Sequence, residues 1–299
     1  MANYNQNKGK GFLYLKVNGG LGNQMFQWAM ARTFKEILDV DVFLDMSYFA
    51  KRYSRPYQLD IFKVKPDFVK GEITKMKLEI IWAFRKILQG VRVFGIRYYE
   101  EQSFNYDSGV HKIGSNSYIS GFFQSERYFR SIADKIREDF KFAVYPTENS
   151  AKIIAHINRC NAVSLHIRRG DYVAKKRYQD QYAQCSLSYY KRAVDYIAER
   201  HPDPTLFIFS DDIEWVKKNL RFPHECVYVE GNNGEKSYED MRLMSLCSHN
   251  IIANSSFSWW GAWLNPNPDK IVVAPTRWFN DPDVIQTDII PPEWVKLEN

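Results

Sequence analysis

The sequence predicts an α/β protein with two Rossmann-like domains that face a cleft. In the second half, short apolar segments alternate with segments of helical periodicity, a pattern typical of a parallel sheet covered by helices. The first half opens with a strand pattern, a glycine loop and a helix. A chain of 299 residues, 45% apolar and 25% charged, is long enough for two compact cores. We expect domains at 1–145 and 146–299, with the boundary in the segment 141–150, which contains Pro146.

The first half is regular at its start and less regular in its middle. Apolar and helical periodicity predict the following elements: a strand at 12–17, a helix at about 23–38, a strand at 40–44, a helix at 73–88, a strand at 118–122 and a helix at about 126–140.

The helix at 73–88 carries apolar residues at helical spacing, with lysines and arginines between them: Ile73, Met76, Ile80, Phe84 and Ile87. We expect this face to pack in the core, because apolar stripes of surface helices usually do. Peripheral contact with a membrane is the alternative.

The second half alternates strand and helix without interruption. The predicted strands are 162–167, 205–209, 226–229, 250–253 and 270–274. The predicted helices between and after them are 188–200, 213–220, 237–247 and 257–264. This order predicts a Rossmann-like domain.

Charge and cysteine content narrow the class of protein. The net charge is +6, but the basic residues are scattered among acids without a long Lys/Arg run, which argues against nucleic acid and suits an anionic sugar nucleotide or a membrane-bound glycan acceptor. The four cysteines lack Cys-x-x-Cys spacing, so neither a zinc site nor a disulfide framework is indicated. Residues 1–10 are polar, and no apolar run reaches roughly 18 residues. We expect a cytoplasmic protein, with peripheral contact at the inner membrane surface as the qualification.

The segment from Val163 to Asp171 ends a predicted strand with His166, Arg168, Arg169 and Asp171. The carboxyl end of a parallel strand faces the ligand crevice of an open α/β sheet. A guanidinium is a planar fork of donors that fits phosphate oxygens, so two adjacent arginines indicate a diphosphate site. A surface Arg–Asp ion pair of little energetic value is the alternative.

Two further segments complete a pattern: Gly19-Gly-Leu-Gly-Asn-Gln-Met-Phe-Gln27 and Asn254-Ser-Ser-Phe-Ser-Trp-Trp-Gly-Ala-Trp-Leu-Asn265. Together with the central segment and in this order, they resemble the bacterial α-1,2-fucosyltransferases, and the resemblance covers most of the chain. It implies the GT-B architecture. The His-x-Arg-Arg-x-Asp motif is shared with α-1,6- and protein O-fucosyltransferases, whereas the serine and tryptophan block looks specific to the α-1,2 group.

The resemblance also implies roles for the central residues. The residue matching His166 contacts the guanine edge, and the residue matching Arg168 binds the β-phosphate. Arg169 either does likewise or anchors the loop by pairing with an acid. Asp171 has three interpretations: it orients an arginine, caps a helix or turn, or acts as a base for the acceptor hydroxyl.

The flanking motifs supply further candidates. The glycine loop lacks the third glycine of a dinucleotide fingerprint, so it either simply reverses the chain or, as the resemblance implies for Gly22 and Asn23, faces the donor. Ser255, Ser256 and the amide of Phe257 start a helix, where hydroxyls and orphan amides suit a phosphate. The tryptophans that follow are expected to be mostly core packing.

Asp240 lies 15 residues before Ser255, where related fucosyltransferases have an aspartate that accepts hydrogen bonds from guanine N1 and N2. Asp240 also falls in the first turn of a predicted helix, where acids commonly serve the helix dipole, so that interpretation stays open.

Two acidic pairs imitate metal motifs. Asp39-Val-Asp41 precedes a strand and indicates a turn, and Asp211-Asp212, with Glu214, is interpreted as a capping box. No metal is expected, because the arginines already offer charge for the diphosphate.

The leading hypothesis is an inverting α-1,2-fucosyltransferase that transfers L-fucose from GDP-β-L-fucose to the 2-hydroxyl of a terminal galactose in a glycan. Alternatives are the same fold with another linkage, such as α-1,6, or another donor, and a non-catalytic protein that binds nucleotide or glycan.

Overall fold

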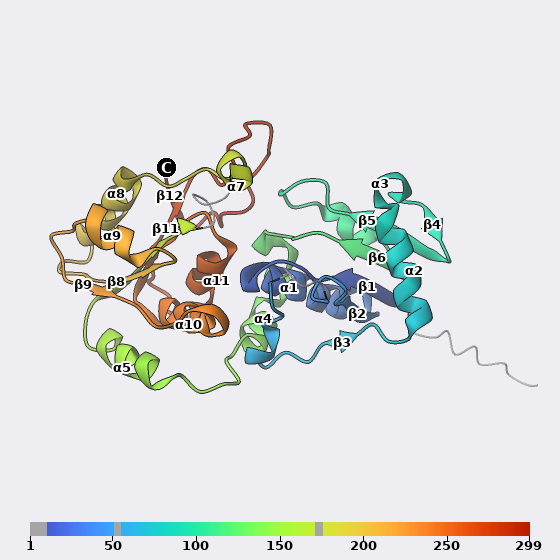
Figure 1. Cartoon of the computed structure of the whole chain (residues 1–299), viewed down its shortest axis with the longest axis horizontal. Coiled ribbons are helices and arrows are strands. Elements are labelled where there is room, and N and C mark those ends of the chain that lie inside the picture. The colour runs from blue at the N-terminus through green and yellow to red at the C-terminus, as the bar shows by residue number, and fades with distance from the viewer. Residues whose placement is uncertain (1–10, 51–54, 171–175) are drawn as a thin grey trace, which may run out of the picture.

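Two six-stranded sheets, each covered by helices, form the computed structural model, which describes residues 11–50, 55–170 and 176–299 (Figure 1). The strand orders are β3-β2-β1-β6-β5-β4 and β12-β11-β10-β7-β8-β9. Neighbouring strands run parallel, apart from β4, which is antiparallel to β5. The predicted GT-B-like α/β architecture is confirmed. The division at residues 145 and 146 stays a prediction.

The first sheet is built from short strands around one long helix. Its elements are β1 (Phe12–Lys16), α1 (Leu21–Leu38), β2 (Asp41–Asp45), η1 (Leu59–Ile61), β3 (Asp67–Phe68), α2 (Glu72–Ala83), α3 (Arg85–Leu88), β4 (Arg92–Val93), β5 (Ile96–Glu100), η2 (Ser108–Lys112), β6 (Ser117–Ser120), η3 (Glu126–Tyr128), η4 (Arg130–Ile132) and α4 (Ala133–Asp139). The strands β3, β4 and β5 were not predicted, because they have two to five residues and lack a clear apolar pattern.

The predicted helix at 73–88 is divided at Phe84, and its orientation differs from the expectation. The stripe of α2 that packs on the sheet is Leu78 and Ile81, which lie against Tyr98 and Tyr118. Most of the longer apolar stripe instead faces outward: Ile73 is 68% exposed, Met76 53%, Phe84 56% and Ile87 74%, whereas Ile80 is half-buried. The prediction that this stripe belongs to the core was therefore wrong, because a second, shorter stripe, Leu78 and Ile81, is the one that packs against the sheet.

The second sheet follows the predicted alternation closely. Its elements are α5 (Glu148–Ile157), β7 (Ala162–Ile167), α7 (Lys176–Gln181), α8 (Leu187–Ala198), β8 (Thr205–Ser210), α9 (Ile213–Asn219), β9 (Cys226–Tyr228), η5 (Gly234–Lys236), α10 (Tyr238–Leu246), β10 (His249–Ile251), α11 (Ser256–Leu264), β11 (Val272–Pro275) and β12 (Val295–Leu297). Every residue of the central strand β7 is buried, including the polar Ser164 and His166 between its apolar residues. The elements α5, α7 and β12 were not predicted.

Helices α1 and α11 lie side by side between the two sheets and join their cores (Figure 1). Trp259 and Trp260 of α11 are fully buried, and their ring centroids lie 4.6 and 4.8 Å from that of Phe26 on α1. Each buried indole N–H has a partner, since Trp259 donates to the Ile289 carbonyl at 2.8 Å and Trp260 to the Gly22 carbonyl at 3.0 Å. The tryptophans are thus mainly core residues, as predicted.

Candidate active site

The ends of β7 and β8 bring the central arginine motif together with an aspartate. These strands pair in parallel with Ile167 opposite Ser210, so the loops that follow them leave the same edge of the sheet. Arg168 Nη1 lies 2.8 Å from Asp211 Oδ2, and both side chains are about one-quarter exposed (26% and 25%). Asp211 Oδ1 also accepts the backbone N–H groups of Arg169 and Gly170, each at 2.9 Å. Asp211 therefore fixes the loop and aims the guanidinium.

The capping-box interpretation took Asp211, three residues before Glu214, as the capping residue, and this was wrong. Asp212 is the N-cap of α9, because its Oδ1 accepts the Trp215 backbone N–H at 3.3 Å. Asp211 does not cap α9 and instead forms the ion pair with Arg168. The signal that could have found Asp211 was present in the sequence, since adjacent parallel strands of a sheet place the residues after them side by side.

Arg169 points to α9. Its guanidinium lies 3.7 Å from the centroid of the Trp215 ring, and its Nε is 3.5 Å from Asp212 Oδ2. A cation stacked on an indole and facing a carboxylate is held on the protein. This placement favours the anchoring interpretation, and diphosphate binding by Arg169 stays a prediction. Asp171 lies outside the described residues.

His166 is buried on β7, and its ring centroid lies 6.1 Å from that of Phe257 at the start of α11. Burial, reinforced by the positive charge of Arg168, lowers the pKa of His166 to about 4. The imidazole is therefore neutral at physiological pH, with one donor and one acceptor nitrogen. In the part of the chain that the structure describes, its Nδ1 has no hydrogen-bond partner. Buried polar atoms usually have a partner, so this nitrogen can pair with a bound molecule or with water, and its contact with guanine stays a prediction.

The amino termini of α1 and α11 meet at Gly22. A Cβ atom on Gly22 would lie 2.5 Å from the Ser256 carbonyl carbon and 2.7 Å from the Phe257 nitrogen. Gly22 is therefore glycine because of a close helix contact, whatever its predicted role toward the donor. The first turn of a helix has unpaired N–H groups and a partial positive charge. Two such ends in contact favour a bound anion.

Asn23 connects three segments at this junction. Its Oδ1 accepts hydrogen bonds from Ser256 Oγ at 2.8 Å and from Gln124 Nε2 at 2.9 Å. Gln124 lies after β6, so Asn23 joins both sheets at one side chain. The structure thus brings together Asn23 and Ser256, two residues that the motifs assigned separately to the donor, and adds Gln124, which lies in an irregular segment and has no sequence signal.

Ser255 is the N-cap of α11, and its Oγ accepts the Phe257 backbone N–H at 3.3 Å. Capping and ligand binding are compatible, because Ser255, Ser256 and Phe257 are each only partly buried. Their contact with a phosphate stays a prediction.

Asp240 lies in the first turn of α10, which packs against α11. Its Oδ1 accepts a hydrogen bond from Asn232 Nδ2 at 2.8 Å. Burial raises the pKa of Asp240 to about 7, and the nearby Glu239 adds to the rise. A helix-start aspartate that serves only the helix dipole is usually solvated and ionised, so this one is unusual for that role.

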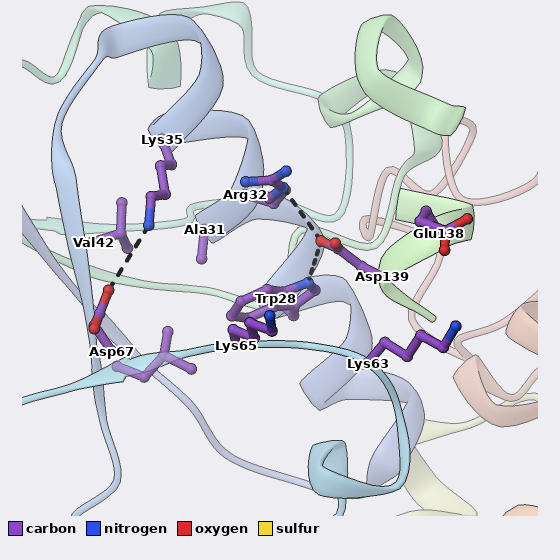
Figure 2. A pocket seen from close by; sticks show the side chains of 11 residues that line it. Trp28, Ala31, Arg32, Lys35, Val42, Lys63, Lys65, Asp67, Glu138 and Asp139 are labelled. Carbon is purple, nitrogen blue, oxygen red and sulfur yellow. Dashed lines mark hydrogen bonds and ion pairs between the residues drawn. The ribbon is translucent and has the colours of Figure 1, made fainter. Parts of the chain in front are cut away.

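A separate cavity of about 490 Å³ lies along the far part of α1, against β2 and the end of α4 (Figure 2). None of the predicted site residues lines it. Its cations Arg32 and Lys35 face Asp139 at 3.3 Å and Asp67 at 3.8 Å, and Trp28 also donates to Asp139. The cavity therefore does not belong to the candidate site.

Among residues 11–50, 55–170 and 176–299, no group of three or more His, Cys, Asp or Glu side chains is arranged to hold a metal ion. Within those same ranges, no helix is both long enough and apolar enough to cross a membrane.

Comparison with known proteins gives one family match over almost the whole chain. The model of glycosyl transferase family 11 matches residues 2–298. An α-1,2-colitosyltransferase of Escherichia coli is 37% identical over 292 residues, which cover 95% of this chain and 98% of that protein. The O-antigen biosynthesis glycosyltransferase WbnK of Escherichia coli is 34% identical and covers 89% of this chain and 95% of its own length.

More distant similarities are weaker. Galactoside α-(1,2)-fucosyltransferase 1 of Rattus norvegicus is 27% identical over 154 residues, 49% of this chain and 41% of the rat protein. The crystal structure of fucosyltransferase NodZ from Bradyrhizobium is 14% identical with a TM-score of 0.48, over 87% of this chain and 94% of NodZ.

Proposed function

Because this chain belongs to glycosyl transferase family 11, we propose that it is an inverting α-1,2-fucosyltransferase. It transfers L-fucose from GDP-β-L-fucose to the 2-hydroxyl of a terminal galactose in an oligosaccharide. The names of two relatives, an α-1,2-colitosyltransferase and a galactoside α-(1,2)-fucosyltransferase, support the α-1,2 linkage.

The observation that carries the proposal is the pairing of Arg168 with Asp211 at the ends of β7 and β8. The ion pair holds the guanidinium at the carboxyl ends of two adjacent parallel strands, the edge of the sheet at which such folds bind their ligands. A guanidinium held in this way is preorganised for the oxygens of a departing diphosphate. The partial positive charges at the starts of α1 and α11 add to the same effect.

In the proposed reaction, the bond from fucose C1 to the β-phosphate oxygen breaks, and a bond from C1 to galactose O2 forms on the opposite face. Negative charge grows on the β-phosphate while the sugar passes through an oxocarbenium-like state. Arg168 stabilises that charge. As the bond from C1 to galactose O2 forms, the hydroxyl loses its proton to water or to a base, for which Asp171 is the candidate, and GDP leaves as the anion, so charge balances without a metal ion.

Guanine is assigned to the region of His166 and Asp240. A neutral buried imidazole with an unpartnered Nδ1 suits the edge of a base. A carboxylate that accepts from guanine N1 and N2 would select guanine over adenine, which lacks that pair of donors.

The affinity for GDP should rise with pH because of Asp240. Its pKa is about 7, so the carboxylate that accepts from guanine is formed above pH 7 and lost below it. We expect GDP to bind on the order of tenfold more tightly at about pH 8 than at about pH 6. Calorimetric titration checks this. The control is Asp240→Asn, which keeps the acceptor for Asn232 and should flatten the profile, so that titration of GDP itself is separated. An unchanged profile in that variant would leave Asp240 as a helix-start residue.

Colitosyl transfer is the second candidate, since the 37% identical relative is named for it. Colitose is fucose without its 3-hydroxyl, so the two donors test one contact. A site that hydrogen-bonds the 3-hydroxyl rejects the deoxy sugar strongly, whereas a site without that contact does not.

The experiment that tests the function is a donor screen with GDP-fucose and GDP-colitose, with lactose or lacto-N-biose as acceptor, followed by linkage analysis of the product. We expect fucose on galactose O2. A higher kcat/KM with GDP-colitose than with GDP-fucose would show that the proposed donor is wrong. A different linkage in the product would show that the proposed acceptor hydroxyl is wrong. Binding of GDP without turnover of either donor would indicate the non-catalytic alternative.

A further inference from the structure

The α2–α3 segment and the hairpin that follows it carry six exposed large apolar side chains. We call this group the α2–α3 surface, and its residues are Ile73, Met76, Phe84, Ile87, Val91 and Phe94. Their exposed fractions run from 47% for Val91 to 74% for Ile87. Single exposed apolar residues need no explanation, but a group of this size usually marks an interaction site.

The surface lies away from the junction of the two sheets. Helices α2 and α3 and strand β4 stand at the edge of the molecule opposite the second sheet (Figure 1). A ligand on this surface would leave the Asn23 and Arg168 region open. The surface is therefore independent of the proposed reaction and needs an occupant of its own.

The charge around the surface identifies that occupant. Residues 68–97 contain seven basic residues and two acidic ones, a difference of +5, although Asp67, Glu100 and Glu101 flank this segment and Lys75 pairs with Glu72. The basic residues are Lys70, Lys75, Lys77, Arg85, Lys86, Arg92 and Arg97, and the acidic ones are Glu72 and Glu79. We propose that the α2–α3 surface docks the protein on an anionic lipid bilayer. The apolar side chains enter the boundary of the acyl chains, and the basic side chains meet the headgroup phosphates.

A second copy of the chain fits this surface less well. A twofold dimer places the same patch on both partners, so the excess of +5 would face itself. Like charges at an interface oppose association. An anionic bilayer can bury the apolar side chains and also pair its headgroup phosphates with the basic ones.

Phe94 adds a second, independent observation. Phe94 and Gly95 form the two-residue turn between Val93 and Ile96, and both have positive φ, 54° and 78°. Turns of this kind strongly prefer Asn-Gly, because a side chain such as phenylalanine is strained at positive φ. Phe94 is nevertheless 52% exposed, and its ring contact with Lys77 is a distant one, with Nζ 5.9 Å from the ring centroid, so burial does not explain the phenylalanine. Strain kept at an exposed position points to a role in binding.

The test measures sedimentation of the full-length protein with vesicles, without donor or acceptor. One set of vesicles mixes phosphatidylglycerol with phosphatidylcholine, and the other contains phosphatidylcholine alone. We expect binding to the anionic vesicles that weakens with salt, and little binding to the neutral ones. Because no sugar is present, the outcome is independent of the proposed reaction.

Three variants separate the contributions. Phe94→Asn suits the turn and should keep or raise the melting temperature while weakening vesicle binding about tenfold, through lost apolar burial. Lys70→Glu combined with Lys86→Glu should weaken it at least about 25-fold, since each basic residue contributes about fivefold. Ile285→Ser is the control, because Ile285 is 60% exposed but lies in the second sheet's part of the chain.

The proposal is overturned if the wild type ignores anionic vesicles, or if Phe94→Asn and the charge variant bind as tightly as the wild type. It is also overturned if the wild type is dimeric in sedimentation and Phe94→Asn is monomeric, since the surface would then bind a second copy. Equal loss in Ile285→Ser would show that the apolar contribution is not specific to this surface.

Discussion

Replacing Arg168 with alanine should lower turnover by about 10²–10³-fold and leave the fold intact. The reason is that the change removes a charge-assisted contact that strengthens as the diphosphate departs. The loop itself should survive, because Asp211 keeps its hydrogen bonds to the Arg169 and Gly170 backbone. Arg168→Lys should recover little, since an ammonium lacks the planar fork that spans Asp211 and a phosphate oxygen. Initial rates at saturating donor measure the loss of turnover, and thermal melting checks that the fold is intact.

Arg192→Ala is the matched control, because Arg192 is not one of the candidate site residues. Its Nη2 donates an exposed hydrogen bond to the Glu298 carbonyl at 2.6 Å. It should retain wild-type turnover. Asp211→Asn tests the positioning role: we expect a lower kcat with a smaller effect on KM, because the contact matters most in the transition state. Near-wild-type turnover in Arg168→Ala would remove Arg168 from the mechanism.

Gly22→Ala should destabilise the protein by at least about 3 kcal/mol, the upper part of the range for overpacking. Its new methyl group would lie 2.5 Å from the Ser256 carbonyl carbon, a backbone atom that cannot move without moving α11. Separating α1 from α11 also stretches the hydrogen bond from Ser256 to Asn23, so activity should fall with stability. Denaturant unfolding measures the free energy of unfolding, and the donor assay measures activity.

Gly20→Ala is the matched control two residues away. Nothing lies within 4 Å of a Cβ at Gly20, and its φ of −80° suits any residue. The change should cost less than about 1 kcal/mol, the ordinary penalty of alanine at a helix N-cap. If Gly22→Ala were as stable as Gly20→Ala, the two helix termini would not be in the tight contact described above.

Most of the second sheet was predictable because its signals are local. A strand buried on both faces, such as β8, contains a continuous apolar run, Leu206 to Phe209. The motif residues were expected at strand ends and helix starts, and the structure has Arg168 directly after β7 and Ser255 as the N-cap of α11, whereas their contact with a donor stays a prediction. The weak elements of the first sheet were missed, since two-residue strands such as β4 carry no periodicity.

Sequence by itself determined the α/β class, the order of the long elements and the edge of the sheet where the candidate site lies. Tertiary structure alone decided which of two stripes on α2 packs inward, since Leu78 and Ile81 fit the sheet and the longer stripe did not. It also decided that Asp211 holds Arg168 and that Gly22 touches Ser256. Hydrophobic periodicity records whether a residue is suited to burial, but not which partner buries it. Contacts between residues more than 200 positions apart depend on how the two sheets pack, and no local pattern encodes that packing.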